Sequence, residues 1–285
     1  MTEETLKENE FCKISLLKEN GEPKLITKTF SDEKFFAKEL RLIQSLSSAV
    51  PAEADNQKLT FPYLTELSNI IQTPSSEEAA TDLIRQCIGI LAELKSKTIV
   101  HRDIKPGNLY LNDQARLFLN DFETALETEG QISENTCGTP GFMAPEQYSS
   151  SKVDWLADQY SFGAVIFNIL TGTKPFKSGT KEELFELQKS AIPDPSLINA
   201  KLKKPFCELT RKMMDPDKKK RYQSIEDLYR AVQLCAASIQ KKEILDNKVV
   251  RIEKIINKKS KKSQLPLILY IIAALILAAL AFKLI

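Results

Sequence analysis

The stretch His101-Arg-Asp-Ile-Lys-Pro-Gly-Asn108 decides how this sequence folds and what chemistry it can carry. It places a carboxylate, Asp103, an ammonium group, Lys105, and a carboxamide, Asn108, on one loop that contains proline and glycine. A carboxylate can accept a proton, an ammonium group can steady a transferring phosphoryl group, and an amide oxygen can hold a metal ion. His101 is the single histidine of the chain, and we interpret it as a structural residue of the loop.

A second acidic residue follows this loop. Asp121-Phe122-Glu123 begins thirteen residues after Asn108, beyond a short hairpin predicted from Leu109–Leu111 and Leu117–Leu119. Such a hairpin could return Asp121 to a position beside Asn108. An amide oxygen and a carboxylate are hard ligands that suit Mg²⁺ bound to nucleotide phosphates. The sequence therefore predicts a metal site made by these two residues.

Three further motifs follow in order: Thr136-Cys-Gly-Thr-Pro-Gly-Phe-Met-Ala-Pro-Glu146, Asp158-Gln-Tyr-Ser-Phe-Gly163 and Asp215-Pro-Asp-Lys-Lys-Lys-Arg221. With the first loop, they resemble the eukaryotic-type (Hanks-type) Ser/Thr protein kinase family over roughly residues 5–238. The resemblance implies an α+β fold of two lobes: a small β-rich N-terminal lobe with one helix, and a larger helical C-terminal lobe. It also implies ATP as phosphate donor, Mg²⁺ or alternatively Mn²⁺ as metal, and proteins as substrates.

The resemblance assigns roles to residues of the C-terminal lobe. Asp103 is similar to the catalytic base and Lys105 to the residue that contacts the γ-phosphate, while Asn108 and Asp121 correspond to the metal ligands of the nucleotide site. Thr139 is expected to buttress Asp103 and Lys105. The remaining roles are structural: Asp158 fixes the backbone of the catalytic loop, Glu146 pairs with Arg221, and Arg102 meets a phosphate on the activation segment, for which Thr136 is the leading acceptor.

In the N-terminal lobe, Lys28 and Glu39 match the family's lysine and its partner on the lobe's helix. Phe61 matches the residue at the back of the nucleotide pocket, and the amide of Leu64 is expected to bind adenine. Pro62 between them retains its carbonyl and should be harmless.

Local patterns predict the elements of this lobe. Phe11–Leu17 and Lys24–Phe30 flank an Asn20-Gly21 turn and form a hairpin. A helix is expected from about Ser31, its N-cap, to Ser47, with further strands at Val50–Ala54 and Lys58–Tyr63. The apolar face of this helix is predicted to contain Phe35, Phe36, Leu40, Ile43 and Leu46.

The sequence departs from the family at two places. Lys7–Cys12 contains no glycine where the phosphate-binding loop is expected, so backbone N–H groups should approach phosphates less closely and nucleotide affinity should fall. Glu123 replaces the glycine that follows Asp121-Phe122, which reduces backbone freedom there. An inactive kinase fold that serves as a membrane-tethered scaffold or binding module is therefore the alternative function. A small-molecule phosphotransferase is a weaker one.

Composition sets the domain organisation. The 285 residues carry 42% hydrophobic residues, a net charge of +2 and five cysteines without a C-x-x-C pair, as expected for a folded protein with free thiols. Residues 1–240 are predicted to form the catalytic domain, with lobes at about 1–63 and 64–240. Residues 241–264 form a basic linker, and 265–285 a transmembrane tail anchor.

The anchor prediction rests on an apolar run from Leu265 to Phe282 that contains no charge. As a helix, 265–285 would extend about 31 Å, enough to cross a bilayer. Nine Lys or Arg and three acidic residues precede it in 241–264, so the catalytic domain should be cytosolic and the linker should contact anionic lipid. Its apolar residues at helical spacing also allow a homodimer through a juxtamembrane helix, or merely a solvated spacer. Nucleic-acid binding is not expected.

Overall fold

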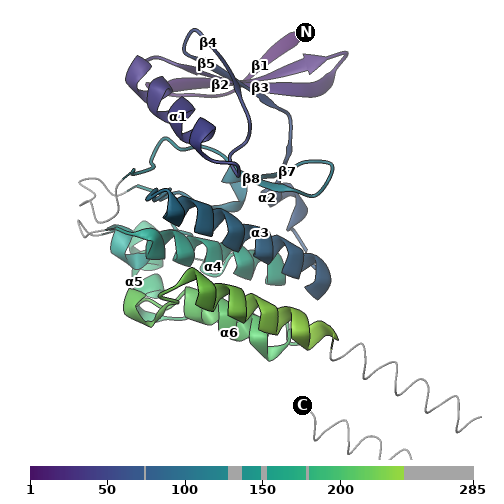
Figure 1. Ribbon diagram of the computed structural model, residues 1–285, viewed down its shortest axis with the longest axis vertical. Coiled ribbons are helices and arrows are strands. Elements are labelled where there is room, and N and C mark those ends of the chain that lie inside the picture. The colour runs from purple at the N-terminus through teal and green to yellow at the C-terminus, as the bar shows by residue number, and fades with distance from the viewer. Residues whose placement is uncertain (74, 128–136, 149–152, 178–179, 241–285) are drawn as a thin grey trace, which may run out of the picture. The chain divides into compact units, whose positions relative to one another are not determined.

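A computed structural model describes residues 1–73, 75–127, 137–148, 153–177 and 180–240. The chain divides into one unit, Met1–Ala236, and a second, Ala237–Ile285, most of which lies outside the described residues. Figure 1 shows the elements of the first unit, a sheet followed by layers of helices. The predicted linker and transmembrane segment lie outside the described residues, and no described helix has the length and apolar character needed to span a bilayer.

An antiparallel five-stranded sheet forms the N-terminal part, in the order β1-β2-β3-β5-β4. Its strands are β1 (Thr2–Glu8), β2 (Cys12–Glu19), β3 (Glu22–Phe30), β4 (Glu53–Asp55) and β5 (Lys58–Pro62). Asn20 and Gly21 join β2 to β3 with φ angles of 53° and 88°. Both angles lie in the left-handed region that this dipeptide adopts readily, so the predicted hairpin is confirmed. The predicted strand over Val50–Ala54 is wrong in its first half, because Val50 instead donates its N–H to Leu119 O, at 3.0 Å.

Helix α1 (Glu33–Ser45) packs against this sheet. The predicted cap is wrong: Asp32, not Ser31, accepts the Lys34 N–H at 2.7 Å. Ser31 Oγ instead donates to backbone oxygens of the preceding loop, at 2.6 Å to Glu10 O. Of the predicted apolar face, Ile43 is buried within the helix and Leu46 just after it, whereas Leu42 was not expected to be buried.

The C-terminal part begins with a three-stranded sheet and is otherwise helical. The sheet has the order β6 (Thr65–Glu66), β7 (Leu109–Leu111) and β8 (Leu117–Leu119), and the last two strands are the hairpin predicted before Asp121. The helices are α2 (Leu67–Ile70), α3 (Glu77–Ser96), α4 (Trp155–Thr171), α5 (Lys181–Ser190), α6 (Lys204–Met213) and one that runs from 225 through 240. Short 3₁₀ turns occur at Pro106–Asn108, Pro145–Tyr148, Pro195–Leu197 and Lys218–Lys220. A β-rich part followed by a helical part confirms the predicted two-lobed α+β architecture.

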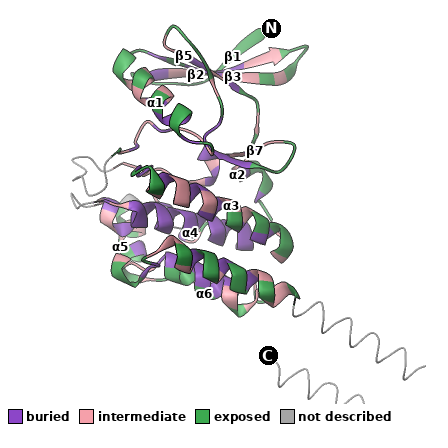
Figure 2. Ribbon diagram, viewed as in Figure 1, coloured by how far each residue is buried: buried purple, intermediate pink, exposed green. Residues whose placement is uncertain are grey.

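Helix α4 is the centre of the helical core. Every one of its residues is buried, and it packs against α3 and α6 (Figure 2). A Cβ at Gly163 would lie 2.7 Å from Met214 Cγ and 2.9 Å from Met213 Cβ. Because such contacts are too short for real atoms, glycine is what permits the end of α6 to approach α4 this closely. The α4 core is the rigid base on which the catalytic loop rests.

Candidate active site

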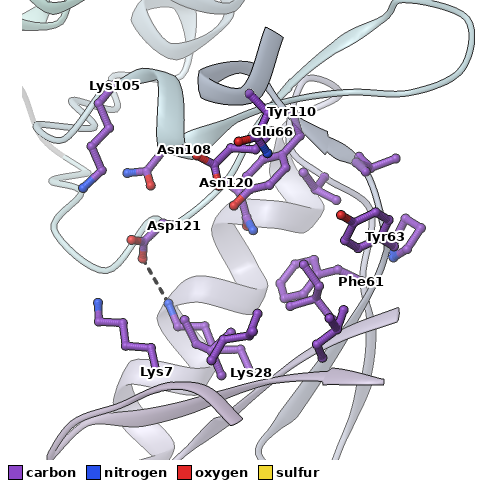
Figure 3. A pocket seen from close by; sticks show the side chains of 18 residues that line it. Lys7, Lys28, Phe61, Tyr63, Glu66, Lys105, Asn108, Tyr110, Asn120 and Asp121 are labelled. Carbon is purple, nitrogen blue, oxygen red and sulfur yellow. Dashed lines mark hydrogen bonds and ion pairs between the residues drawn. The ribbon is translucent and has the colours of Figure 1, made fainter. Parts of the chain in front are cut away.

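A cavity of about 420 Å³ lies between the five-stranded sheet and the catalytic loop. Apolar side chains of β2 and β3 line one side, among them Ile14 and Ile26, and polar side chains from Lys105 to Asp121 line the other (Figure 3). Phe61 and Leu64, predicted to border a nucleotide base, both line it. An apolar enclosure with convergent polar groups is typical of a small-molecule site.

Lys28, on β3, forms the main charge cluster of this cavity. Its ammonium group lies 2.8 Å from Glu39 Oε2 on α1 and 3.1 Å from Asp121 Oδ1. Burial disfavours the charged ammonium, but the two carboxylates outweigh this effect and raise the pKa of Lys28. Lys28 therefore remains protonated, and the predicted pairing of Lys28 with Glu39 is present in the structure.

Asp103 and Lys105, on the catalytic loop (residues 101–108), form a closed triangle of hydrogen bonds with Thr139. Lys105 Nζ donates to Asp103 Oδ2 and to Thr139 Oγ1, each at 2.8 Å, and Thr139 Oγ1 donates to Asp103 Oδ1 at 2.7 Å. The amide nitrogen of Asn108 donates to Asp103 O at 2.8 Å. These bonds fix the Asp103 carboxylate beside Lys105 and Asn108, which both line the cavity. The sequence predicted these four residues as one site, and the structure brings them together.

Asp158, on α4, holds the backbone of the same loop. Its two carboxylate oxygens accept the N–H groups of His101 at 2.7 Å and Arg102 at 2.9 Å. Arg102 has a φ of 70°, which is costly for a residue with a side chain, so these bonds offset a strained backbone. His101 also packs edge-on against Phe122 at 5.0 Å between ring centroids. The expected structural roles of Asp158 and His101 agree with these contacts.

Glu146 and Arg221 form the predicted ion pair below the site. The guanidinium donates to both carboxylate oxygens, at 2.6 and 2.9 Å, and its side chain is fully buried. Arg221 also donates to the backbone oxygens of Asp215 and Leu156, both at 2.8 Å. Removing either partner would leave a buried charge uncompensated, at a cost of about 3–5 kcal/mol.

Asn108 and Asp121 fit a magnesium ion. Because Asn108 donates through its nitrogen, its amide oxygen is left for the cavity, and Asp121 presents a carboxylate beside it (Figure 3). Burial opposes ionisation of Asp121, yet Lys28, with smaller contributions from His101 and Lys7, lowers its pKa. Two hard oxygens suit Mg²⁺ whose other ligands are phosphate oxygens and water. Within the described residues no cluster of three His, Cys, Asp or Glu offers a different metal site.

The glycine-free loop between β1 and β2 closes on itself. Asn9 Oδ1 accepts the N–H groups of Phe11 at 2.9 Å and Cys12 at 2.8 Å. These are backbone donors of the kind that a glycine-rich loop offers to phosphate. Because these N–H groups bond within the loop, the structure agrees with the expectation that the backbone of Lys7–Cys12 is less available to phosphate than that of a glycine-rich loop.

Lys7 is a site residue that the sequence analysis missed. It lines the cavity, and Figure 3 shows its side chain beside Lys28, with its nitrogen on the side of Asp121. Lys7 pairs with Ile14 across the sheet, just after a register shift between Thr5 and Lys7. A bulge re-aims a side chain, and cross-strand partners share a face, so Lys7 follows Ile14 into the cavity. Asn120 was also missed. The residue lines the same cavity, and its Oδ1 is buried and accepts no hydrogen bond from a described residue.

Glu123, the second departure from the family pattern, does not adopt a glycine-like backbone. The positive φ angle in this segment falls on Asp121, at 66°. Lys38, next to Glu39 on α1, donates to Glu123 O at 3.0 Å, and Arg41 forms an ion pair with Glu127. The segment after Asp121 is therefore attached to α1 through backbone and side chain. Thr136 lies outside the described residues.

Comparison with known proteins now identifies the family. The model of the protein kinase domain matches residues 20–233. This match covers more than half of the chain, so the chain belongs to the protein kinase domain family.

Individual relatives are similar over part of their length. They include serine/threonine-protein kinase polo of Drosophila melanogaster, 33% identical over 141 residues, which are 48% of this chain and 24% of the relative. Serine/threonine-protein kinase PLK1 of Xenopus laevis is 31% identical over 156 residues, 54% and 25% of the two chains. Serine/threonine-protein kinase cds1 of Schizosaccharomyces pombe is 30% identical over 161 residues, 53% and 35%. The matched part thus spans about a quarter to a third of these relatives.

Proposed function

We propose that this protein is a serine/threonine protein kinase that transfers the γ-phosphate of ATP to hydroxyl groups of protein substrates. One observation carries the proposal: Lys105 and Asn108, which both bond to Asp103, line the same cavity as Lys28 and Asp121. A base, a phosphate-binding ammonium group and two metal-ligand oxygens therefore converge where a nucleotide fits. The relatives described above are all serine/threonine-protein kinases, which supports the same function.

Each side chain has a defined part in the transfer. The acceptor hydroxyl binds beside Asp103, which takes its proton as the hydroxyl oxygen forms a bond to the γ-phosphorus. The bond from that phosphorus to the oxygen bridging to the β-phosphate breaks, and ADP leaves. Lys105 offsets charge on the transferring group, and Lys28 binds the phosphates that remain on ADP. When bound, Mg²⁺ neutralises phosphate charge, and Asn108 and Asp121 supply its protein ligands.

Lys7 supports nucleotide binding in place of glycine. With the loop N–H groups of Phe11 and Cys12 used by Asn9, a cation at the cavity mouth replaces backbone donors as the phosphate contact of this hairpin. An ammonium group is a common phosphate ligand. It attracts phosphate through its charge and does not require the backbone to approach closely.

The decisive experiment is phosphate transfer by the full-length chain. Purified protein is incubated with labelled ATP, with Mg²⁺ or Mn²⁺, and with a generic protein acceptor, beside an Asp103→Asn control. We expect phosphoserine and phosphothreonine in the acceptor or in the kinase itself. Incorporation no greater than that of the control, with both metals, would support the inactive scaffold instead.

Regulation through the activation segment is part of the proposal. Arg102 directly precedes Asp103, and its Nε donates to Thr124 O at 2.6 Å, which places the guanidinium beside the start of this segment. Phosphate on Thr136, or on Ser133 or Thr128 behind it, would gain charge-assisted bonds to Arg102. Mass spectrometry of autophosphorylated protein tests this. No phosphate between Asp121 and Glu146 would exclude this form of control.

Membrane anchoring is also proposed from the sequence. The charge-free run in 265–285 and the nine basic residues of 241–264 support a single span with residues 1–240 as the cytosolic catalytic domain. The linker would lie on anionic lipid or pair with a second copy. The full-length protein should resist extraction by alkali yet dissolve in detergent, and deletion of 265–285 should release it. Alkali-soluble full-length protein would refute the span.

A further inference from the structure

A second depression, of about 360 Å³, adjoins the catalytic triangle, because Lys105 and Thr139 line it. We name it the acceptor groove and define it by Ser68, Lys105, Gly107, Thr139, Phe142 and Lys174, six of its lining residues. Because Lys105 and Thr139 belong both to the groove and to the triangle around Asp103, a hydroxyl at Asp103 would place its neighbouring residues in this groove.

The charged side chains that line the groove are basic. Lys105 and Lys174 are the charged residues among the described side chains that line it. Lys105 is compensated by Asp103 at 2.8 Å. Lys174 is exposed, stands 6.0 Å from the centre of the Phe142 ring, and forms no ion pair with any described residue. Its charge therefore remains available to whatever lies in the groove.

Glu66 is a second acidic group close to the groove, in addition to Asp103. A Cβ built on Gly107 would lie 3.4 Å from Glu66 Oε1, so Gly107 leaves this part of the groove without a side chain of its own. Glu66, however, lines the nucleotide cavity and accepts a hydrogen bond from Ser68 Oγ. It forms no ion pair with Lys174, which lies on the loop after α4.

We propose that Lys174 selects protein substrates in which an anionic side chain, a carboxylate or an existing phosphate, lies within about three residues of the acceptor hydroxyl. This inference rests on the proposed kinase function and names its substrate class. An extended segment advances about 3.3 Å per residue, so a groove of this size holds only the residues closest to the acceptor. An anion there gains attraction from Lys174, whereas a lysine or arginine is repelled.

The test uses peptides and the full-length protein in detergent. Each peptide has one acceptor serine in a neutral sequence, and a single Glu, Lys or phosphoserine is moved from three residues before it to three after. Both kcat/KM and affinity by fluorescence anisotropy are measured, so the preference can be read even without phosphate transfer. We expect Glu to exceed Lys by about threefold to tenfold at one or two positions, as for a partly exposed ion pair. The phosphoserine arm shows whether carboxylate or phosphate is the better ligand.

Two variants and one control assign this preference to Lys174. Lys174→Ala should abolish the advantage of Glu, and Lys174→Glu should reverse it in favour of Lys, a gain that misfolded protein cannot show. Lys177→Ala removes an exposed lysine outside the groove and should leave the preference unchanged. The inference would be overturned if the wild type showed equal kcat/KM and affinity for the Glu and Lys peptides. A preference for Glu that persists in Lys174→Glu would overturn it as well. A binding preference without any phosphate transfer would refute the proposed kinase function instead.

Discussion

The catalytic loop and the β1–β2 hairpin border the same cavity but hold their polar groups in opposite ways. In the loop, Asp103 is bonded to Lys105, Thr139 and Asn108, and the backbone is attached to buried Asp158. In the hairpin, every residue of β1 is exposed and the loop N–H groups bond within the loop. The groups proposed to transfer phosphate are thus pre-organised, whereas phosphate binding is proposed to depend on an exposed lysine, Lys7. Substitutions in the two regions should therefore differ in size and in kind.

The largest effect is expected in the catalytic loop and at Asp121. Asp103→Asn or Asp121→Asn should each lower kcat by about three or more decades, because the first removes the base and the second the metal ligand. Rates of phosphate transfer at saturating ATP measure this. A loss below tenfold for either variant would remove that residue from its proposed role.

The next effect concerns Asp158 and the pH dependence of stability. Burial raises the pKa of Asp158 to about 7, against the pull of the Arg102 and His101 N–H groups. An unfolded Asp titrates near pH 4, so the folded chain binds the proton more tightly between these values. The free energy of unfolding contributed by this group should therefore fall as pH rises from about 4 to about 7, by on the order of 4 kcal/mol.

Urea unfolding at several pH values checks this, with Asp158→Asn as the comparison. Asn retains an oxygen to accept one N–H, so the variant should fold, but it cannot ionise. The unfolding free energy of Asp158→Asn should lack the contribution that decreases as pH rises. Identical slopes in the two proteins would show that Asp158 is ionised throughout this range.

A smaller effect is expected at Lys7. Lys7→Ala should raise the KM for ATP about fivefold with little change in kcat, because an exposed cation contributes on the order of 1 kcal/mol to binding a charged ligand. The loss should decrease from ATP to ADP and vanish for adenosine, which lacks phosphate. Lys13→Ala, which removes a lysine paired with Glu3 on the exposed edge of the sheet, is the matched control. Equal losses for ATP and adenosine would mean that Lys7 acts through structure and not through charge.

The smallest effect is expected at Asn9. Asn9→Gly frees the N–H groups of Phe11 and Cys12 and should lower the KM for ATP by about twofold to threefold. Cys12 is left unchanged because it is buried. An unchanged or higher KM would show that the Asn9 turn itself positions the hairpin over the nucleotide.

The same contrast explains what the sequence could predict. Asp103, Lys105 and Asn108 could be placed together because they lie on one short loop, and their roles were assigned by resemblance to the kinase family. Lys28 and Glu39 lie on different elements, and their pairing was predicted from the same resemblance. The Asn20-Gly21 turn likewise fixed the first hairpin by its own backbone preference.

Strand β1, Lys7, the cap of α1 and Asn120 could not be predicted, because local sequence patterns do not decide their structure. Strand β1 was missed because all its residues are exposed, which leaves no alternation of polar and apolar residues. Lys7 was missed because a bulge, invisible in sequence, sets its direction. Ser31 and Asp32 can both cap a helix, and tertiary bonds of Ser31 to the preceding loop decided between them. Asn120 carries no signal beyond its place before Asp121.

Helix α1 connects the cavity at Lys28 with the start of the activation segment at Glu123, two regions that could otherwise change independently. Glu39 bonds to Lys28 in the cavity, and the adjacent Lys38 bonds to Glu123 O at the start of the activation segment. A rigid helix cannot satisfy one contact while moving far from the other. Under the proposed function, nucleotide affinity and the order of this segment would therefore be thermodynamically linked: the factor by which nucleotide favours the ordered segment equals the factor by which the ordered segment favours nucleotide. A change in the activation segment would then alter how tightly the protein binds ATP.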